Sequence, residues 1–171
     1  MTADSAETAE QPASGGGTGT GGSGIRGTGP GVIAPDGSAV EFYATMPPEG
    51  EPEIIHSAIP ARATILELGS GAGRITHPLV ALGHRVVAVD ESAEMLARIH
   101  GAETVRARFG ELELAERFDV VLLASYFVNV PSDVVRHELL RTCRRYSPPG
   151  SWMSPGSSLP FAGHAWRLTA T

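Results

Sequence analysis

Residues 63–90 read ATILELGSGAGRITHPLVALGHRVVAVD, and their pattern of apolar residues and glycines predicts the class of fold. An apolar run at residues 63–68 ends in glycines, and a second apolar run occupies residues 85–89. Between them, residues 74–82 carry apolar side chains near helical spacing. The pattern therefore predicts a strand, a helix and a second strand, which is the unit from which parallel α/β sheets are built.

The alternation of helices and strands continues to about residue 145. Ser92 is placed as the N-cap of a second helix, and Ser132 as the N-cap of a third helix that ends near Arg145. A weak strand is expected at residues 103–108 and a strong one, FDVVLLA, at residues 118–124. Strands that alternate with helices predict an α/β fold with a mainly parallel sheet and right-handed connections.

The composition divides the chain into four segments. Residues 1–31 are rich in Gly, Ser and Thr, which predicts a disordered tail, because almost no large apolar side chain is available for burial. Residues 32–62 form a lead-in segment, and residues 63–150 form the folded domain. Residues 151–171 contain prolines and glycines without sustained alternation, so an irregular C-terminal tail is expected. The sheet is therefore expected to be incomplete, with only its first four strands.

The lead-in segment carries large apolar residues between turn-forming prolines and glycines. These residues are expected to anchor the segment to a core, and they are Val40, Phe42, Tyr43 and Met46. The prolines that follow interrupt any long helix or strand. A short, anchored segment of this kind is expected to cover a pocket.

The composition also restricts the class of protein and of partner. The 171 residues are 42% hydrophobic and 19% charged, which fits one globular domain. The net charge of −6 opposes binding to nucleic acid or to an anionic membrane surface, so a small molecule is the favoured partner. One cysteine excludes an internal disulfide, and neither a signal peptide nor a membrane span is evident, which together predict a cytoplasmic protein. The six histidines lack metal-ligand spacing, so no metal site is predicted.

Glycines gather where the first strand turns into the first helix, the edge at which open α/β sheets bind ligands. Gly69, Gly71 and Gly73 permit positive φ angles and a close approach of the backbone to a ligand, and Glu67 precedes them. Asp90 ends the second strand, where a carboxylate can accept hydrogen bonds from both ribose hydroxyls. The alternatives are an ordinary turn and a solvated or helix-capping Asp.

The glycine spacing separates two classes of nucleotide site. In the dinucleotide fingerprint G-x-G-x-x-G the third glycine would fall at Arg74, and the acid Glu67 would repel a pyrophosphate. An oxidoreductase domain that binds NAD or FAD is therefore the less favoured interpretation.

The run E-x-G-x-G-x-G, followed by VVAVDESAEML, resembles the first two motifs of class I S-adenosylmethionine-dependent methyltransferases. The resemblance covers about residues 40–150. It implies a Rossmann-like, three-layer α/β sandwich, S-adenosyl-L-methionine as cofactor and methyl transfer as the activity. The cofactor-binding residues that it implies are Glu67, Gly69, Ser70, Gly71, Gly73, Asp90, Glu91, Met95 and Phe109.

The resemblance also assigns roles to these residues. The glycine loop is expected to lie along the methionine part of the cofactor, with Glu67 holding its amino group. Asp90 is expected to bind the ribose, while Glu91 and Met95 flank the ribose and adenine. The backbone at Phe109 is expected to contribute to adenine recognition.

Two departures from the family pattern stand out. The third strand of the family usually ends in an acid near the adenine amino group, and Arg108 stands at that position here. The family sheet has seven strands, whereas only four are predicted, so the chain is expected to be truncated or altered after about Gly150. An inactive methyltransferase fragment, with residual or no cofactor binding, is therefore a further alternative.

The sequence says little about the methyl acceptor. Because the cofactor supplies the reactivity, no strong catalytic signature is required. Ser125, Tyr126 and Asn129 follow the fourth strand and are candidate catalytic residues, although packing or turn roles fit each of them as well. The predicted acceptor is an unidentified small molecule rather than nucleic acid, and no oligomeric state is predicted.

Overall fold

The computed structural model describes residues 31–123, 131–149, 152–155 and 166–169. Its centre is a six-stranded sheet in the order β3-β2-β1-β4-β6-β5. The strands are β1 (Thr64–Leu68), β2 (Arg85–Asp90), β3 (Glu103–Arg106), β4 (Val120–Leu123), β5 (Trp152–Pro155) and β6 (Trp166–Thr169). The helices are α1 (Val40–Thr45), α2 (Glu51–Ala58), α3 (Thr76–Ala81), α4 (Ala93–Leu96) and α5 (Asp133–Tyr146), with a 3-10 turn η1 (Phe109–Glu111).

The first four strands form the parallel part of the sheet. β1 lies in the middle, with Ile65 opposite Val86 of β2 on one side and Val120 of β4 on the other. β3 pairs in parallel with the outer side of β2. The four strands predicted from the sequence are therefore confirmed, with ends that differ by one or two residues.

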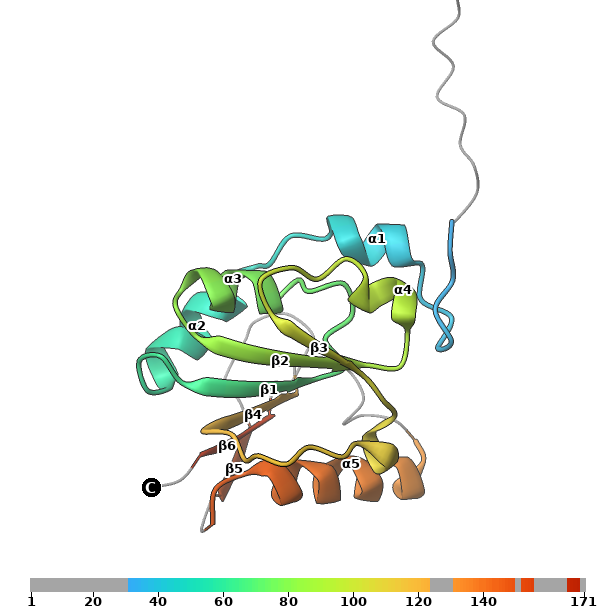
Figure 1. Ribbon diagram of the computed structural model, residues 1–171. Coiled ribbons are helices and arrows are strands. Elements are labelled where there is room, and N and C mark those ends of the chain that lie inside the picture. Colours follow the sequence, from blue (N-terminus) through green and yellow to red (C-terminus); the bar gives the residue numbers. More distant parts are fainter. Residues whose placement is uncertain (1–30, 124–130, 150–151, 156–165, 170–171) are drawn as a thin grey trace, which may run out of the picture.

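Helices cover both faces of the parallel strands (Figure 1). Because successive side chains of a strand point to opposite faces, Ile65 packs with Leu79 of α3 and Ile55 of α2. Leu66 packs on the other face with Leu139 of α5. Each fully buried side chain of this size contributes roughly 1.5–3 kcal/mol relative to its exposed state. The result is the predicted three-layer α/β sandwich.

The helix caps that the sequence indicates are present. The hydroxyl of Ser92 accepts a hydrogen bond from the backbone N–H of Met95, and that of Ser132 accepts one from Val135. The first predicted helix starts later than expected, at Thr76, because the residues before it belong to the glycine loop. In the part of the chain that the structure describes, no helix is both long and apolar enough to cross a membrane.

The C-terminal residues differ from the prediction of an irregular tail. β6 pairs antiparallel with β4, placing Leu168 opposite Val121, and β5 pairs antiparallel with β6. The sheet therefore does not stop at the four strands that the sequence predicted, and β6 covers the edge of β4 that faces away from β1. The sequence prediction failed here because two four-residue strands, one of which ends in a proline, give little periodic signal. The pairing of β6 with β4 is a contact across more than forty residues, which local periodicity does not reveal.

The lead-in segment follows the prediction only in part. Val40 is buried, but Phe42 and Tyr43 are exposed and contact each other edge to face, so they do not anchor the segment to the core. A helix of six residues presents few side chains inward, and here Val40 takes that position. The predicted disordered tail lies outside the described residues, except for Gly31.

Candidate cofactor-binding site

The loop after β1 is held against the end of β2 by backbone hydrogen bonds. Gly69, Gly71 and Gly73 have φ angles of 71°, 55° and 90°, which side chains other than glycine rarely adopt. The N–H groups of Gly69 and Ser70 both donate to the carbonyl of Val89, at 2.8 and 3.0 Å. The loop is therefore fixed at the carboxyl ends of β1 and β2.

Gly71 and Gly73 differ in what surrounds them. A Cβ atom added at Gly71 would meet no heavy atom within 4 Å, so this glycine borders open space. A Cβ atom at Gly73 would lie 2.7 Å from the His77 ring and 3.0 Å from Ile99. Gly73 is therefore required by internal packing, whereas Gly71 leaves room for a ligand against the backbone.

Asp90 lies beside the open part of the loop. Its Oδ2 accepts a hydrogen bond from the N–H of Gly71 and its Oδ1 accepts one from Ser92, each at 2.9 Å. Partial burial raises the pKa of Asp90, and these two backbone hydrogen bonds act in the opposite direction. Each carboxylate oxygen retains a further lone pair, so Asp90 can still accept hydrogen bonds from a diol.

Glu67 lies beneath the loop with 1% of its surface exposed. The hydroxyl of Thr76, at the start of α3, donates to its Oε2 at 2.6 Å. Burial raises the pKa of Glu67 to about 7, and the charge of Asp90 adds to this rise, while Thr76 and Arg74 oppose it. A carboxyl group with this pKa changes charge near neutral pH and can respond to a positively charged ligand.

The other residues predicted to bind the cofactor make contacts within the protein. Ser70 is buried, and its hydroxyl contacts the carbonyl of Val89 at 3.4 Å. Met95 is buried in a small cluster with Ala34 and Val40, so its side chain holds the lead-in segment over the site. Glu91 forms an ion pair with an arginine after β3, and the carbonyl of Phe109 accepts a hydrogen bond from a threonine of α5.

The candidate catalytic residues Ser125, Tyr126 and Asn129 lie outside the described residues. Within the described ranges, no group of three or more His, Cys, Asp or Glu side chains could hold a metal ion. Cys143 lies on the buried face of α5, in the core. Burial raises the pKa of its thiol to about 12, so it is not a nucleophile at neutral pH.

Three residues near the site were not predicted from the sequence. Thr76 donates to Glu67, and Arg74 forms a 2.5 Å ion pair with Glu51 of α2 that fastens the lead-in segment to the glycine loop. Asp36 lies in a turn of the lead-in, and its charge contributes to the raised pKa of Asp90. Thr76 is the first residue of a helix and Asp36 belongs to an Asp-Gly turn. Residues at such positions usually have only local roles, so the sequence gives little indication that they contribute to a binding site.

The arrangement fits the cofactor implied by the glycine motif: open space at Gly71, a carboxylate at Asp90 and a buried acid at Glu67. Residues 65–150 match the model of a family described as Methyltransferase domain. The chain belongs to this methyltransferase family. The match extends over half of the chain, from β1 to the turn before β5.

Individual relatives agree with this assignment. An uncharacterised methyltransferase of Mycobacterium tuberculosis is 45% identical over 67 residues, which are 39% of this chain and 28% of that protein. A ubiquinone biosynthesis O-methyltransferase of Paramagnetospirillum magneticum is 33% identical over 113 residues, 61% of this chain and 44% of that protein. The chain therefore matches less than half the length of either relative.

Solved structures share the Rossmann-like fold of this methyltransferase domain. A TehB-like, S-adenosylmethionine-dependent methyltransferase from Corynebacterium glutamicum superposes with a TM-score of 0.60 at 18% identity, covering 76% of this chain and 92% of the other. The glycopeptide N-methyltransferase MtfA, in complex with S-adenosyl-L-methionine, gives a TM-score of 0.53 at 20% identity, covering 71% and 70%. At these identities the likeness concerns the fold.

Proposed function

We propose that this chain binds S-adenosyl-L-methionine at the glycine loop and directs transfer of its methyl group to a small-molecule acceptor. The observation that carries the proposal is the concentration of carboxylates around that loop. Glu67 lies beneath it, Asp90 lies beside it, and Asp36 is close enough to Asp90 to raise its pKa. Such a site has a negative potential, which favours a ligand with net positive charge.

The charge separates the two candidate cofactors. S-adenosyl-L-methionine carries a sulfonium and an ammonium group against one carboxylate, whereas NAD and FAD carry a pyrophosphate. A pyrophosphate on the loop would face the Glu67 carboxylate, and the nearby Arg74 is already paired with Glu51. Glu67 therefore disfavours the dinucleotide interpretation, whereas Asp90 fits the ribose of either cofactor.

Each residue has a defined part in binding. Glu67 would hold the amino group of the methionine moiety, and Asp90 would accept hydrogen bonds from the ribose hydroxyls. The glycine loop keeps side chains out of the space that the cofactor would occupy, because Gly71 places nothing there. The cofactor, when bound, supplies an activated methyl group that is displaced in line by the acceptor atom. The protein supplies orientation and excludes water.

The acceptor is proposed to be a small molecule that presents an oxygen or nitrogen atom. The net charge of −6 disfavours a nucleic acid, whose phosphates would be repelled. The related proteins include an O-methyltransferase of ubiquinone biosynthesis and a glycopeptide N-methyltransferase, which supports either acceptor atom. The inactive-fragment alternative loses its main support, because the sheet has two strands beyond the four on which that alternative was based.

Calorimetric titration of the chain with S-adenosyl-L-methionine and, separately, with NAD tests the proposal. We expect saturable binding of the sulfonium compound only, and binding at least about tenfold weaker in Asp90→Ala. Gly71→Ala is expected to weaken binding, whereas Gly83→Ala is the matched control. Gly83 also has a positive φ, 92°, and open space around it, but it precedes β2 at the opposite end of the sheet.

Two outcomes would contradict the proposal. A folded chain that binds only NAD would replace the methyltransferase interpretation with the oxidoreductase one. Equal losses of affinity in Gly71→Ala and Gly83→Ala would show that backbone strain, rather than occupation of the ligand space, explains the effect.

A further inference from the structure

The last residue of β3 and the residues that follow it are attached to Asp90 and Glu91, at the end of β2, by three contacts. The N–H of Ala107 donates to the carbonyl of Asp90 at 3.1 Å, and Nε of Arg106 donates to the carbonyl of Glu91 at 3.0 Å. Nε of Arg108 donates to Oε2 of Glu91 at 3.1 Å, forming an ion pair. Arg108 is therefore attached to Glu91, and Glu91 directly follows Asp90, the proposed ribose ligand.

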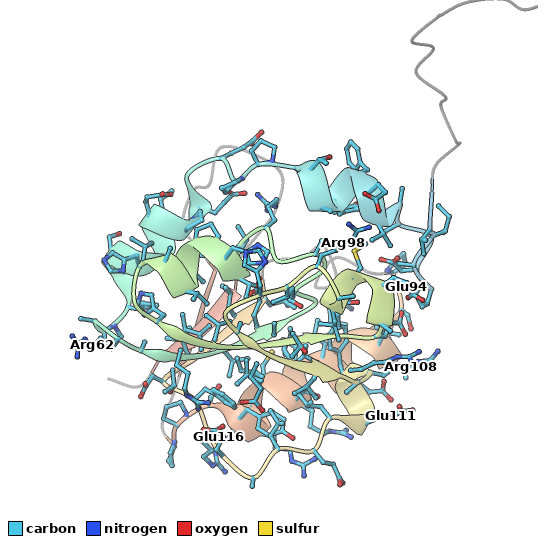
Figure 2. The ribbon with its side chains drawn as sticks, turned by 45° about the horizontal axis from the view of Figure 1, so that its top comes forward. Arg62, Glu94, Arg98, Arg108, Glu111 and Glu116 are labelled. Carbon is cyan, nitrogen blue, oxygen red and sulfur yellow. The ribbon has the colours of Figure 1, made fainter. Side chains whose placement is uncertain are left out.

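The order of the strands indicates which part of the cofactor reaches Arg108. The glycine loop and Glu67 belong to β1, and Asp90 belongs to its neighbour β2. If methionine lies at β1 and ribose at β2, the base continues toward the next strand, β3, and the residues that follow it. Arg108 is there, on the same side of the molecule as Glu94 of α4 (Figure 2), and 72% of its side chain is exposed.

The chemistry of arginine limits what such a side chain can recognise. A guanidinium group has only N–H donors, and Nε of Arg108 is already used by Glu91, which leaves the terminal nitrogens for a ligand. Two terminal donors match two adjacent acceptors, as in the O6 and N7 pair of a 6-oxopurine. The 6-amino group of adenine is a donor and offers nothing to a guanidinium.

We propose that the terminal N–H groups of Arg108, whose Nε is bound by Glu91, donate hydrogen bonds to acceptor atoms of the purine ring of the bound cofactor. The site therefore does not select for the 6-amino group. The inference rests on the proposed function, because it assumes that a nucleoside of the S-adenosylmethionine type binds at the glycine loop. It makes Arg108 a specificity residue of the binding site. The acid that the family usually has at this position would instead accept a hydrogen bond from the amino group.

The test compares two nucleoside thioethers that differ only at position 6 of the purine: S-adenosylhomocysteine, with an amino group, and S-inosylhomocysteine, with a carbonyl. Calorimetry gives the dissociation constant of each for the unchanged chain and for Arg108→Gln. A glutamine side chain pairs with the N6 and N7 groups of adenine, so this variant should restore selection for the amino group. The matched control is Arg85→Gln, because Arg85 also forms ion pairs but stands at the start of β2, at the opposite end of the sheet.

We expect the unchanged chain and Arg85→Gln to bind the inosyl compound at least as tightly as the adenosyl compound. In Arg108→Gln the ratio of the two dissociation constants should shift by about tenfold or more toward the adenosyl compound. Thermal unfolding of Arg108→Gln checks that the exposed substitution leaves the fold intact.

The inference is overturned if the unchanged chain prefers the adenosyl compound by tenfold, or if Arg108→Gln leaves the ratio unchanged. Both of these results leave cofactor binding, and hence the proposed function, in place. A folded chain that binds neither compound refutes the proposed function itself and the inference with it.

Discussion

The buried carboxyl of Glu67 makes cofactor binding depend on pH. Its pKa is about 7 in the folded chain without ligand, because burial penalises the charged form. A ligand ammonium group is held by the ionised carboxylate, so binding must remove the proton from Glu67 wherever that proton is present. The apparent dissociation constant should therefore rise about tenfold for each pH unit below about 7 and level off above it.

The magnitude can be worked out for two conditions. With a pKa of about 7, roughly nine-tenths of Glu67 is protonated at about pH 6 and roughly a quarter at about pH 7.5. The dissociation constant for S-adenosyl-L-methionine is then expected to be about eightfold larger at the lower pH. Calorimetry in two buffers with different ionisation enthalpies should also detect proton release at about pH 6.

Glu67→Gln is the decisive comparison for this prediction. Glutamine keeps the size of the side chain and can still accept the hydrogen bond from Thr76, but it does not ionise. The affinity of Glu67→Gln for the cofactor should be low and nearly independent of pH. Any pH dependence that remains in this variant comes from the titration of other groups. Equal dissociation constants at both pH values in the unchanged chain, or the same slope in Glu67→Gln, would refute the reasoning.

Three further predictions follow from neighbouring contacts. Gly73→Ala should lower the free energy of unfolding by about 1–3 kcal/mol in denaturant titration, because the added Cβ would meet His77. Gly71→Ala should lower the free energy of unfolding by less, and an equal loss in the two variants would contradict the prediction. Thr76→Val removes a hydrogen bond that favours the ionised form of Glu67. The midpoint of the pH dependence of cofactor binding should therefore move up by on the order of one pH unit. An unchanged midpoint would argue against the contact. Burial, together with the nearby His56, lowers the pKa of His84, so the unfolded chain takes up a proton first as the pH falls through about 6.5. The free energy of unfolding should therefore fall less on acidification in the double variant Glu67→Gln, His84→Gln than in the single variant Glu67→Gln. An equal fall in both variants would exclude His84 as its source.

The sequence predicted the parts of the molecule that depend on local patterns. β1, the glycine loop and β2 follow from one continuous run, and the hydrogen bond from Gly71 to Asp90 shows that the loop and the acid lie together, as that run indicates. The caps at Ser92 and Ser132 were predictable because a cap bonds a backbone group only three residues away.

Contacts between distant segments could not be predicted in this way. β6 gains its structure from pairing with β4, and Thr76 gains its role from the burial of Glu67. Phe42 and Tyr43 were expected to anchor the lead-in because they are large and apolar, yet Val40 and the packing of Met95 hold that segment instead. Periodicity identifies a face of a helix or strand, but it does not identify which distant segment covers that face.

The same carboxylates that favour a cationic cofactor lower the stability of the chain without it. As the pH rises from 4.5 to about 7, the unfolded chain ionises Glu67 while the folded chain keeps it protonated, so the free energy of unfolding falls. The difference between the two pKa values corresponds to about 3 kcal/mol at neutral pH. A bound ammonium group favours the ionised form of Glu67 and offsets part of this cost. At equal cofactor concentration, binding should therefore raise the thermal midpoint more in the unchanged chain than in Glu67→Gln, because the variant has the larger dissociation constant and the stabilisation depends on the ratio of ligand concentration to that constant.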